Sequence, residues 1–208
     1  MLLLRFILDL LFPQSDTQAL VRDATLASIG AHARPRQVDE HIVALLPYRR
    51  SLVRACIVEA KFRDNEQAQR LLASMLAEYL AEWSTEHAAL SSSTLVLVPV
   101  PLSAARYKER GYNQTERIAH LAAKQLPDVY LDTDLLARVR DTAPQTSLNG
   151  VERRSNLEGA FQAARTPDPS CTYIVFDDVT TTGTTLRAAI AALRAVHPGA
   201  VMGIALAH

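Results

Sequence analysis

Apolar residues recur at helical spacing in three parts of the chain. Between residues 64 and 83 they form one continuous stripe, which predicts a helix with one core-facing side. Residues 113–126 and 186–196 show the same spacing of three and four and predict two further helices. Pro198 and Gly199 follow the last of them, as expected where a helix ends. We therefore expect three helices that each bury one face.

Short apolar runs occur between these helices, at residues 94–98 (TLVLV) and 173–176 (YIVF), and a third follows the last helix at residues 200–206. Such runs are typical of strands that are buried on both faces of a parallel sheet. Strands that alternate with helices predict an α/β fold with a mostly parallel sheet. Residues 13–45 are polar and irregular and predict no clear element, and residues 141–156 read as a polar connection.

Composition supports an ordinary globular domain. The chain has 208 residues, of which 49% are hydrophobic and 21% charged. Its formal net charge is zero, so its surface as a whole should not attract nucleic acid or an anionic membrane. Its two cysteines exclude a zinc site of four cysteines and a framework of several disulfides. One disulfide remains conceivable, but we expect two free thiols in a reducing compartment.

The apolar start, MLLLRFILDLLFP, is a candidate targeting segment. It lacks a basic region and a small-residue cleavage site, and residues 1–12 fall short of the roughly 20 needed to span a bilayer. A buried or partner-facing helix that ends at Pro13 is the better interpretation. We therefore expect a cytoplasmic protein without a membrane span.

The densest chemical signal is YIVFDDVTTTGTTL, at residues 173–186. An apolar strand ends in Asp177 and Asp178, a threonine-rich loop with Gly183 follows, and a helix then begins. Ligands of open α/β sheets bind at the carboxyl ends of the strands, and the N–H groups at a helix start favour an anion. A helix cap alone would need one aspartate or threonine rather than two aspartates and five threonines. The pattern predicts an anion site.

The paired carboxylates indicate which class of anionic ligand the site would bind. Sugar hydroxyls and hydrated Mg²⁺ both seek carboxylate oxygens, so a Mg²⁺-complexed sugar phosphate fits better than a bare phosphate. The nucleotide motifs G-x-x-x-x-G-K-[ST] and G-x-G-x-x-G are absent from the sequence. So are G-x-S-x-G and H-E-x-x-H.

YIVFDDVTTTGTT resembles the signature for phosphoribosyl pyrophosphate (PRPP) of type I phosphoribosyltransferases. Residues 98–119 (VPVPLSAARYKERGYNQTERIA) and 138–161 (RVRDTAPQTSLNGVERRSNLEGAF) resemble the ComF family of competence-associated, phosphoribosyltransferase-like proteins. With residues 48–65 (YRRSLVRACIVEAKFRDN), the resemblance covers most of the chain. It implies a type I phosphoribosyltransferase-like fold over residues 46–208, with a mostly parallel sheet flanked by helices. Residues 1–45 would form a helical appendage.

The resemblance also implies roles for individual residues. Asp177 and Asp178 would hold the ribose hydroxyls directly or through Mg²⁺, and with Arg110 they would form the catalytic centre. Residues 103–114 would form a hood whose basic side chains neutralise pyrophosphate, unless they are merely a solvated loop. The residues implied for PRPP binding are Val100, Pro101, Arg106, Lys108, Thr180, Thr181, Thr182, Gly183, Thr184 and Thr185. Thr180 could instead simply fill the loop.

One departure concerns the family's N-terminal element. Members commonly carry a cysteine-rich zinc element after the LLFP stretch, whereas residues 13–45 contain no cysteine. A zinc-dependent DNA contact therefore does not carry over to this chain.

Three functions stay open. The first is a phosphoribosyltransferase that joins PRPP to a nitrogen acceptor. The second is a PRPP-binding protein without turnover that acts on single-stranded DNA in competence and DNA uptake. Its basic and aromatic residues would be Arg106, Tyr107, Lys108, Arg110 and Tyr112. The third is a scaffold that binds partner proteins through residues 1–12.

Overall fold

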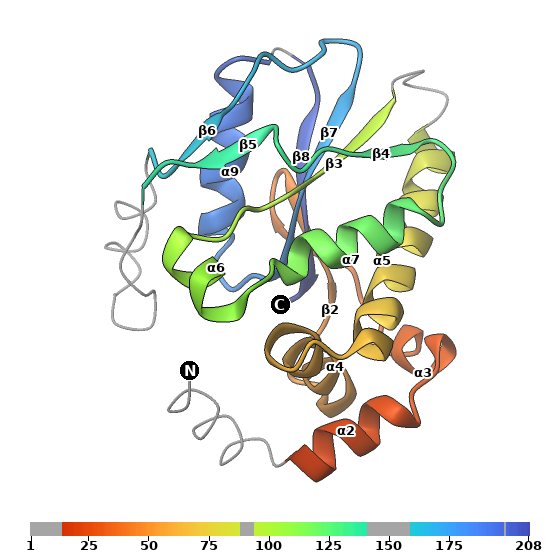
Figure 1. Ribbon diagram of the computed structural model, residues 1–208. Helices are drawn as coiled ribbons and strands as arrows, with labels where there is room; N and C mark the ends of the chain where they lie inside the picture. Colours follow the sequence, from red (N-terminus) through yellow and green to blue (C-terminus); the bar gives the residue numbers. More distant parts are fainter. Residues whose placement is uncertain (1–13, 88–93, 141–158, 198) are drawn as a thin grey trace.

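The computed structural model describes residues 14–87, 94–140, 159–197 and 199–208. They form an α/β fold in which helices lie on both faces of a six-stranded sheet, beside a small two-stranded sheet (Figure 1). The helices are α2 (Gln14–Arg22), α3 (Leu26–Gly30), α4 (Ser51–Phe62), α5 (Glu66–His87), α6 (Ala104–Arg110), α7 (Gln114–Ala123) and α9 (Thr184–Arg194). The strands are β1 (Arg36–Asp39), β2 (Ile42–Leu46), β3 (Leu95–Pro99), β4 (Val129–Leu131), β5 (Leu136–Arg138), β6 (Phe161–Ala163), β7 (Thr172–Val179) and β8 (Val201–Ala207).

The large sheet has the strand order β1-β2-β8-β7-β3-β4. Every neighbouring pair in it is parallel except β1 with β2. Strands β5 and β6 form the separate antiparallel pair. The predicted α/β fold with a mostly parallel sheet is therefore confirmed.

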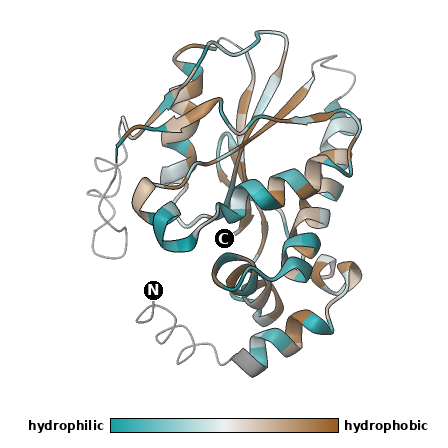
Figure 2. Ribbon diagram, in the orientation of Figure 1, coloured by the Kyte–Doolittle hydropathy of each residue, from teal (hydrophilic) through white to brown (hydrophobic). Residues whose placement is uncertain are grey.

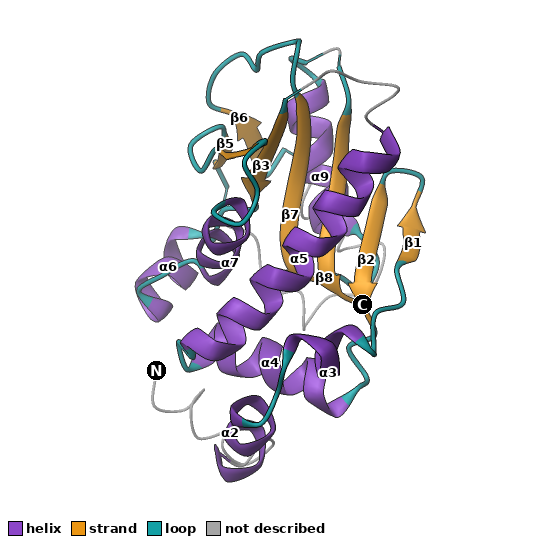
Figure 3. Ribbon diagram, turned by 90° about the vertical axis from the view of Figure 1, so that its right-hand side faces the viewer, coloured by secondary structure: helices purple, strands orange, loops and turns teal. Residues whose placement is uncertain are grey.

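The central strand β7 shows how the sheet separates two cores. Side chains alternate along a strand, and Ile174 and Phe176 pack on the face covered by α4, α5 and α7. Tyr173 and Val175 pack on the other face, with α9 and the β5–β6 pair. Figure 3 shows α5 in front of the sheet and α9 behind it. Burial on both faces is why the strand reads as a continuous apolar run.

The three predicted helices are present as α5, α7 and α9. Helix α4 was not predicted. Seven of its twelve residues are buried, so its apolar positions form a nearly continuous run that local pattern does not distinguish from a buried strand. Its buried residues are Val53, Ala55, Cys56, Ile57, Val58, Glu59 and Ala60. Figure 2 shows that α6, in contrast, is largely hydrophilic.

The prediction of irregular structure for residues 13–45 is wrong for the part that the structure describes. That part contains α2, α3, β1 and most of β2. The hydroxyl of Thr17 in α2 donates to Oε1 of the buried Glu59 in α4 at 2.6 Å, which joins the first described helix to the body of the protein. The predicted boundary between the N-terminal appendage (residues 1–45) and the domain (residues 46–208) falls inside β2, which pairs with β8 in the six-stranded sheet.

Two predictions lie outside the described residues: the helix that ends at Pro13 and the connection at 141–156. Within the described ranges, no helix combines the length and the apolar character that crossing a membrane requires.

Candidate functional site

The run of aspartates and threonines at residues 177–185 joins the end of β7 to the start of α9. Strand β7 continues to Val179, so Asp177 and Asp178 lie within it and not after it. Gly183 precedes the helix with a φ of 75°, a conformation that glycine adopts without steric cost. Because β7 lies between β3 and β8, the two carboxylates sit at the carboxyl end of the central part of the sheet.

Asp178 is buried and fully engaged by the protein. Its Oδ2 atom lies 2.6 Å from Nζ of Lys61 in α4 and accepts a hydrogen bond from Nε2 of Gln114 at 2.8 Å. Its Oδ1 atom accepts the N–H of Val179 at 2.7 Å. Burial alone would raise the pKa of Asp178, but the charge of Lys61 and these hydrogen bonds outweigh it and hold the pKa below its usual value. Asp178 is therefore an ionised, ion-paired carboxylate.

Asp177 is in a different electrostatic state. Its Oδ1 atom accepts the N–H of Asp178 at 2.9 Å. Burial, together with the negative charge of Asp178, raises the pKa of Asp177 to about 7, although Lys61 opposes the effect. Two adjacent carboxyl groups thus have pKa values shifted in opposite directions, an arrangement that is frequent in functional sites.

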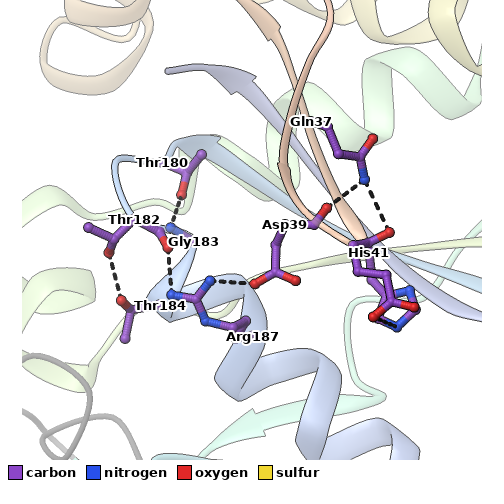
Figure 4. Close-up of polar contacts among 9 residues, drawn as sticks. Gln37, Asp39, His41, Thr180, Thr182, Gly183, Thr184 and Arg187 are labelled. Carbon is purple, nitrogen blue, oxygen red and sulfur yellow. Dashed lines mark hydrogen bonds and ion pairs between the residues drawn. The ribbon is translucent and has the colours of Figure 1, made fainter.

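The threonine loop holds its shape through its own side chains (Figure 4). The hydroxyl of Thr180 accepts the N–H of Gly183 at 3.0 Å, so this residue closes the loop. The hydroxyls of Thr182 and Thr184 are 2.6 Å apart. Thr181 and Thr182 are exposed at the tip. A turn of this kind at the start of a helix presents N–H groups to an anion.

Residues 106–114 (RYKERGYNQ) supply another side of the site. Gln114 connects two predicted site residues, because its Nε2 donates to Asp178 and its Oε1 accepts from Nη1 of Arg110 at 3.1 Å. The Arg110 guanidinium lies 5.1 Å from the centroid of the Phe62 ring, and its buried Nε has no hydrogen-bond partner among the described residues. Burial lowers the pKa of Arg110, while the charge of Asp178 opposes the shift.

The middle of the same segment is structural. Gly111 ends α6 with a φ of 80°. The hydroxyl of Tyr112 donates to the carbonyl of Ala60 at 3.2 Å, and the side chain of Asn113 caps α7 and donates to the carbonyl of Val100 at 3.2 Å. These contacts fix α6 and α7 against α4 and the end of β3.

These elements surround one pocket with a volume of about 250 Å³. All predicted site residues line it except Lys108, which is exposed on α6 outside the pocket. The residues that line it are Lys61, Val100, Pro101, Leu102, Arg106, Arg110, Gln114, Thr115, Arg138, Asp177, Asp178, Val179, Thr180, Thr181, Thr182, Gly183, Thr184 and Thr185. The N–H of Val100 donates to the carbonyl of Phe176 at 2.8 Å, so Val100 contributes pocket wall and no free donor.

The chain is similar to bacterial proteins that are named for competence or DNA utilization. Over 129 residues, or 61% of its length, the chain is 33% identical to Competence protein F of Haemophilus influenzae. It is 33% identical over 131 residues to the DNA utilization protein YhgH of Escherichia coli strain K12. Over 90 residues, or 43% of the chain, it is 37% identical to the YhgH protein of Salmonella typhi. The chain is a homologue of the ComF proteins.

This finding confirms the family resemblance that the motifs indicated. The ComF homologue spans about half the length of the first two relatives, 55% and 56%, and 39% of the third. A comparison with the profiles of known protein families finds no match.

Two basic residues that line the pocket, Lys61 and Arg138, were not among the predicted site residues. Lys61 is a single lysine near the end of the buried helix α4, and Arg138 ends β5. Both fall within segments that resemble the family, yet nothing in their local pattern distinguishes them from surface basic residues. Only the packing of α4 and β5 around the end of β7 brings them to the pocket.

The donor set fits a divalent cation that arrives with its ligand. Within the part of the chain that the structure describes, no group of three or more His, Cys, Asp or Glu side chains could hold a metal ion. Mg²⁺ commonly binds through one or two carboxylates, with waters and substrate phosphates completing its shell. Asp177, whose pKa is raised to about 7, would be held ionised by such a cation, whereas Asp178 already has Lys61 as its counter-ion.

Proposed function

We propose that this ComF homologue binds PRPP with Mg²⁺ in the pocket at the end of β7 and transfers its phosphoribosyl group to a nitrogen acceptor. One observation carries the proposal. A pair of carboxylates, a threonine loop at a helix start and the side chains of Lys61, Arg106 and Arg110 line the same pocket. A sugar that carries a phosphate at one end and a pyrophosphate at the other needs these three kinds of partner. The proposal includes a type I phosphoribosyltransferase-like fold for the α/β body.

Each part of the ligand has a partner in this proposal. The N–H groups and hydroxyls of residues 181–185 bind the 5′-phosphate, because α9 begins there. Asp177 faces the ribose hydroxyls and the cation, and Asp178 lies beside it in the pocket wall with Lys61 as its counter-ion. Lys61, Arg106 and Arg110 neutralise the pyrophosphate, and arginine suits this role because its planar fork engages phosphate oxygens in pairs.

In the reaction, the bond between C1 of the ribose and the pyrophosphate oxygen breaks, and its electron pair leaves with the pyrophosphate. The acceptor nitrogen forms a bond to C1 and loses a proton. The ribose passes through an oxocarbenium-like state, which the protein stabilises mainly by positioning and by charge. Mg²⁺, when bound, would offset the negative charge on the leaving group.

A second candidate function is the handling of single-stranded DNA. Relatives are named Competence protein F and DNA utilization protein, and α6 presents Arg106, Tyr107 and Lys108 to solvent beside the pocket. Tyr107 is 55% exposed, so its ring is free to stack on a base. Tyr112, in contrast, is half-buried beneath the guanidinium of Arg117, which lies 4.2 Å from the centroid of its ring. Tyr112 is therefore a poor stacking platform.

The test is calorimetric titration of Mg·PRPP into the full chain. We expect saturable binding that needs Mg²⁺ and is lost in Asp177→Asn/Asp178→Asn. Binding should persist in the control variant Lys124→Ala, since Lys124 is exposed at the end of α7 and does not line the pocket. Pyrophosphate release with one acceptor from a panel of bases and amines would then establish transfer.

Other outcomes separate the candidates. If Mg·PRPP binds but no acceptor causes release of pyrophosphate, the protein would be one that responds to PRPP without transferring its phosphoribosyl group. Absence of Mg·PRPP binding, together with salt-sensitive affinity for single-stranded DNA that Tyr107→Ala weakens, would favour the second function over the first.

A further inference from the structure

The hairpin formed by β1 and β2 lies directly against the threonine loop, although the two are far apart in the sequence. A Cβ atom added to Gly183 would lie 3.2 Å from Cδ1 of Ile42 and 3.5 Å from Cγ1 of Val38. Both residues belong to the hairpin region. One side of the loop therefore packs against the β1–β2 hairpin, which lies mostly within the predicted appendage of residues 1–45.

Arg187 connects the loop to this hairpin (Figure 4). Its Nη2 donates to the carbonyl of Thr182 at 2.5 Å, and its Nη1 donates to Oδ2 of Asp39 at 2.6 Å. Arg187 lies in the first turn of α9, where its N–H donates to the carbonyl of Gly183 at 2.8 Å. Long helical side chains point back toward the helix start, which brings the guanidinium beside the loop. Arg187 does not line the pocket, so it acts on the loop and not on a ligand.

The hairpin holds Asp39 in place for this contact. The pairing of β1 with β2 shifts register between Gln37 and Asp39, and such a bulge re-aims the side chains beside it. Nε2 of Gln37 donates to the carbonyls of Asp39 at 2.5 Å and of Glu40 at 3.1 Å, which closes the turn. The hydrogen bond from Arg187 lowers the pKa of Asp39, so its carboxylate is ionised at neutral pH.

We infer that Asp39 and Arg187 are positioning residues that keep the threonine loop in its anion-binding shape. The inference rests on the proposed function. Asp39 orients Arg187. Arg187 holds the carbonyl of Thr182 while Thr180 accepts the N–H of Gly183, so the loop is fastened on both sides of the peptide that precedes α9. The side chains of Arg187 and Asp39 are 39% and 30% exposed, so solvent screens the ion pair and the pair itself adds little to stability. Its main effect is on the conformational freedom of the loop.

Asp39→Asn tests this directly, because electrostatics and positioning predict opposite results. Removing a carboxylate near an anion site should tighten anion binding if charge alone matters. If Asp39 positions the loop, the variant should bind Mg·PRPP about 2- to 10-fold more weakly, since the loop must then be ordered on binding. Glu40→Gln removes the same charge one residue further on, where the side chain is 84% exposed, and should bind as the wild type does.

The second measurement needs no ligand. In hydrogen exchange of the free proteins, the amides of residues 181–184 should exchange faster in Asp39→Asn than in Glu40→Gln, with unchanged exchange in the core of β7. Equal exchange rates overturn the inference, and so does faster exchange with unchanged or tighter binding. If the wild type binds no Mg·PRPP, the proposed function fails, and the exchange rates alone then decide whether the pair positions the loop.

Discussion

Nζ of Lys61 in α4 lies 2.6 Å from Oδ2 of Asp178 in β7. This ion pair joins a buried helix to the end of the central strand, on the wall of the candidate site. The Lys61 side chain is 21% exposed and that of Asp178 is 5% exposed, so solvent screens the pair only partly. The pair is therefore a structural contact that also fixes the Lys61 ammonium group on the wall of the pocket.

Replacing Lys61 by methionine should destabilise the fold. The buried carboxylate of Asp178 would keep its hydrogen bonds from Gln114 and Val179 but lose its counter-ion, at a cost of about 1–3 kcal/mol. Urea denaturation measures this loss. Arg70→Met is the control, since Arg70 and Glu66 form an ion pair whose side chains are 70% and 77% exposed, and it should cost less than about 1 kcal/mol.

The double variant Lys61→Met/Asp178→Asn sharpens this prediction. It removes the uncompensated charge as well as the lysine, so it should recover part of the stability that Lys61→Met loses. A double variant as unstable as the sum of the two single variants would show that Lys61 and Asp178 do not depend on each other.

The raised pKa of Asp177 makes the stability of the protein depend on pH. Its folded pKa is about 7, above an unfolded value of about 3.9, so the folded state holds the proton more tightly. The stability from this proton is fully present below about pH 4 and is lost as the pH rises through about 7. A difference of one in pKa corresponds to about 1.4 kcal/mol.

Asp177→Asn should remove this dependence, because asparagine cannot ionise. Urea denaturation at about pH 5 and about pH 8 should show the wild type losing about 1–4 kcal/mol more than the variant between the two conditions. Parallel losses in the two proteins would contradict the raised pKa.

Gly183→Ala should impair the loop through strain and crowding together. The residue has a φ of 75°, and an added Cβ would lie 3.1 Å from Nη1 of Arg187 and 3.2 Å from Cδ1 of Ile42. We expect a loss of about 1–3 kcal/mol in thermal or urea unfolding, with weakened binding of Mg·PRPP.

Gly111→Ala separates the two causes. Gly111 has a φ of 80°, but an added Cβ would meet nothing within 4 Å, so only the backbone strain of about 1–2 kcal/mol remains. Gly183→Ala should therefore be the more destabilising of the two. Equal losses of stability in the two variants would mean that Ile42 and Arg187 move aside for the added Cβ without a measurable free-energy cost.

The two cysteines should differ in their reaction with a thiol reagent such as DTNB. Cys56 is buried in α4, and burial raises the pKa of its thiol to about 12, so the native protein holds almost no thiolate there at about pH 8. Cys171 is half-buried and should react in the native state. Native protein should release one equivalent of dye quickly, and the second only after denaturation. Fast reaction of both thiols would show that α4 opens readily.

Local pattern was sufficient for the elements that bury one face or lie at the centre of the sheet. The apolar stripe of α5 and the apolar runs of β3 and β7 are recognisable in the sequence. A helix that buries one face shows periodic apolar residues, and a strand that buries both faces shows a continuous apolar run. The aspartates and the threonine loop are also consecutive in the sequence, so local pattern was sufficient to place them at the end of β7 and the start of α9. Their role in binding a phosphate stays a prediction.

Tertiary structure alone decided the rest. Helix α4 is buried over most of its surface, so its apolar run alone does not distinguish it from a buried strand. Strand β1 is a polar edge strand that pairs only with β2 in the large sheet. Lys61 contacts Asp178 because α4 packs against the sheet near the end of β7. Asp39 contacts Arg187, 148 positions away in the chain, because β2 and β7 lie on either side of β8 in the sheet. Contacts between distant residues depend on the packing of whole elements, which no local pattern encodes.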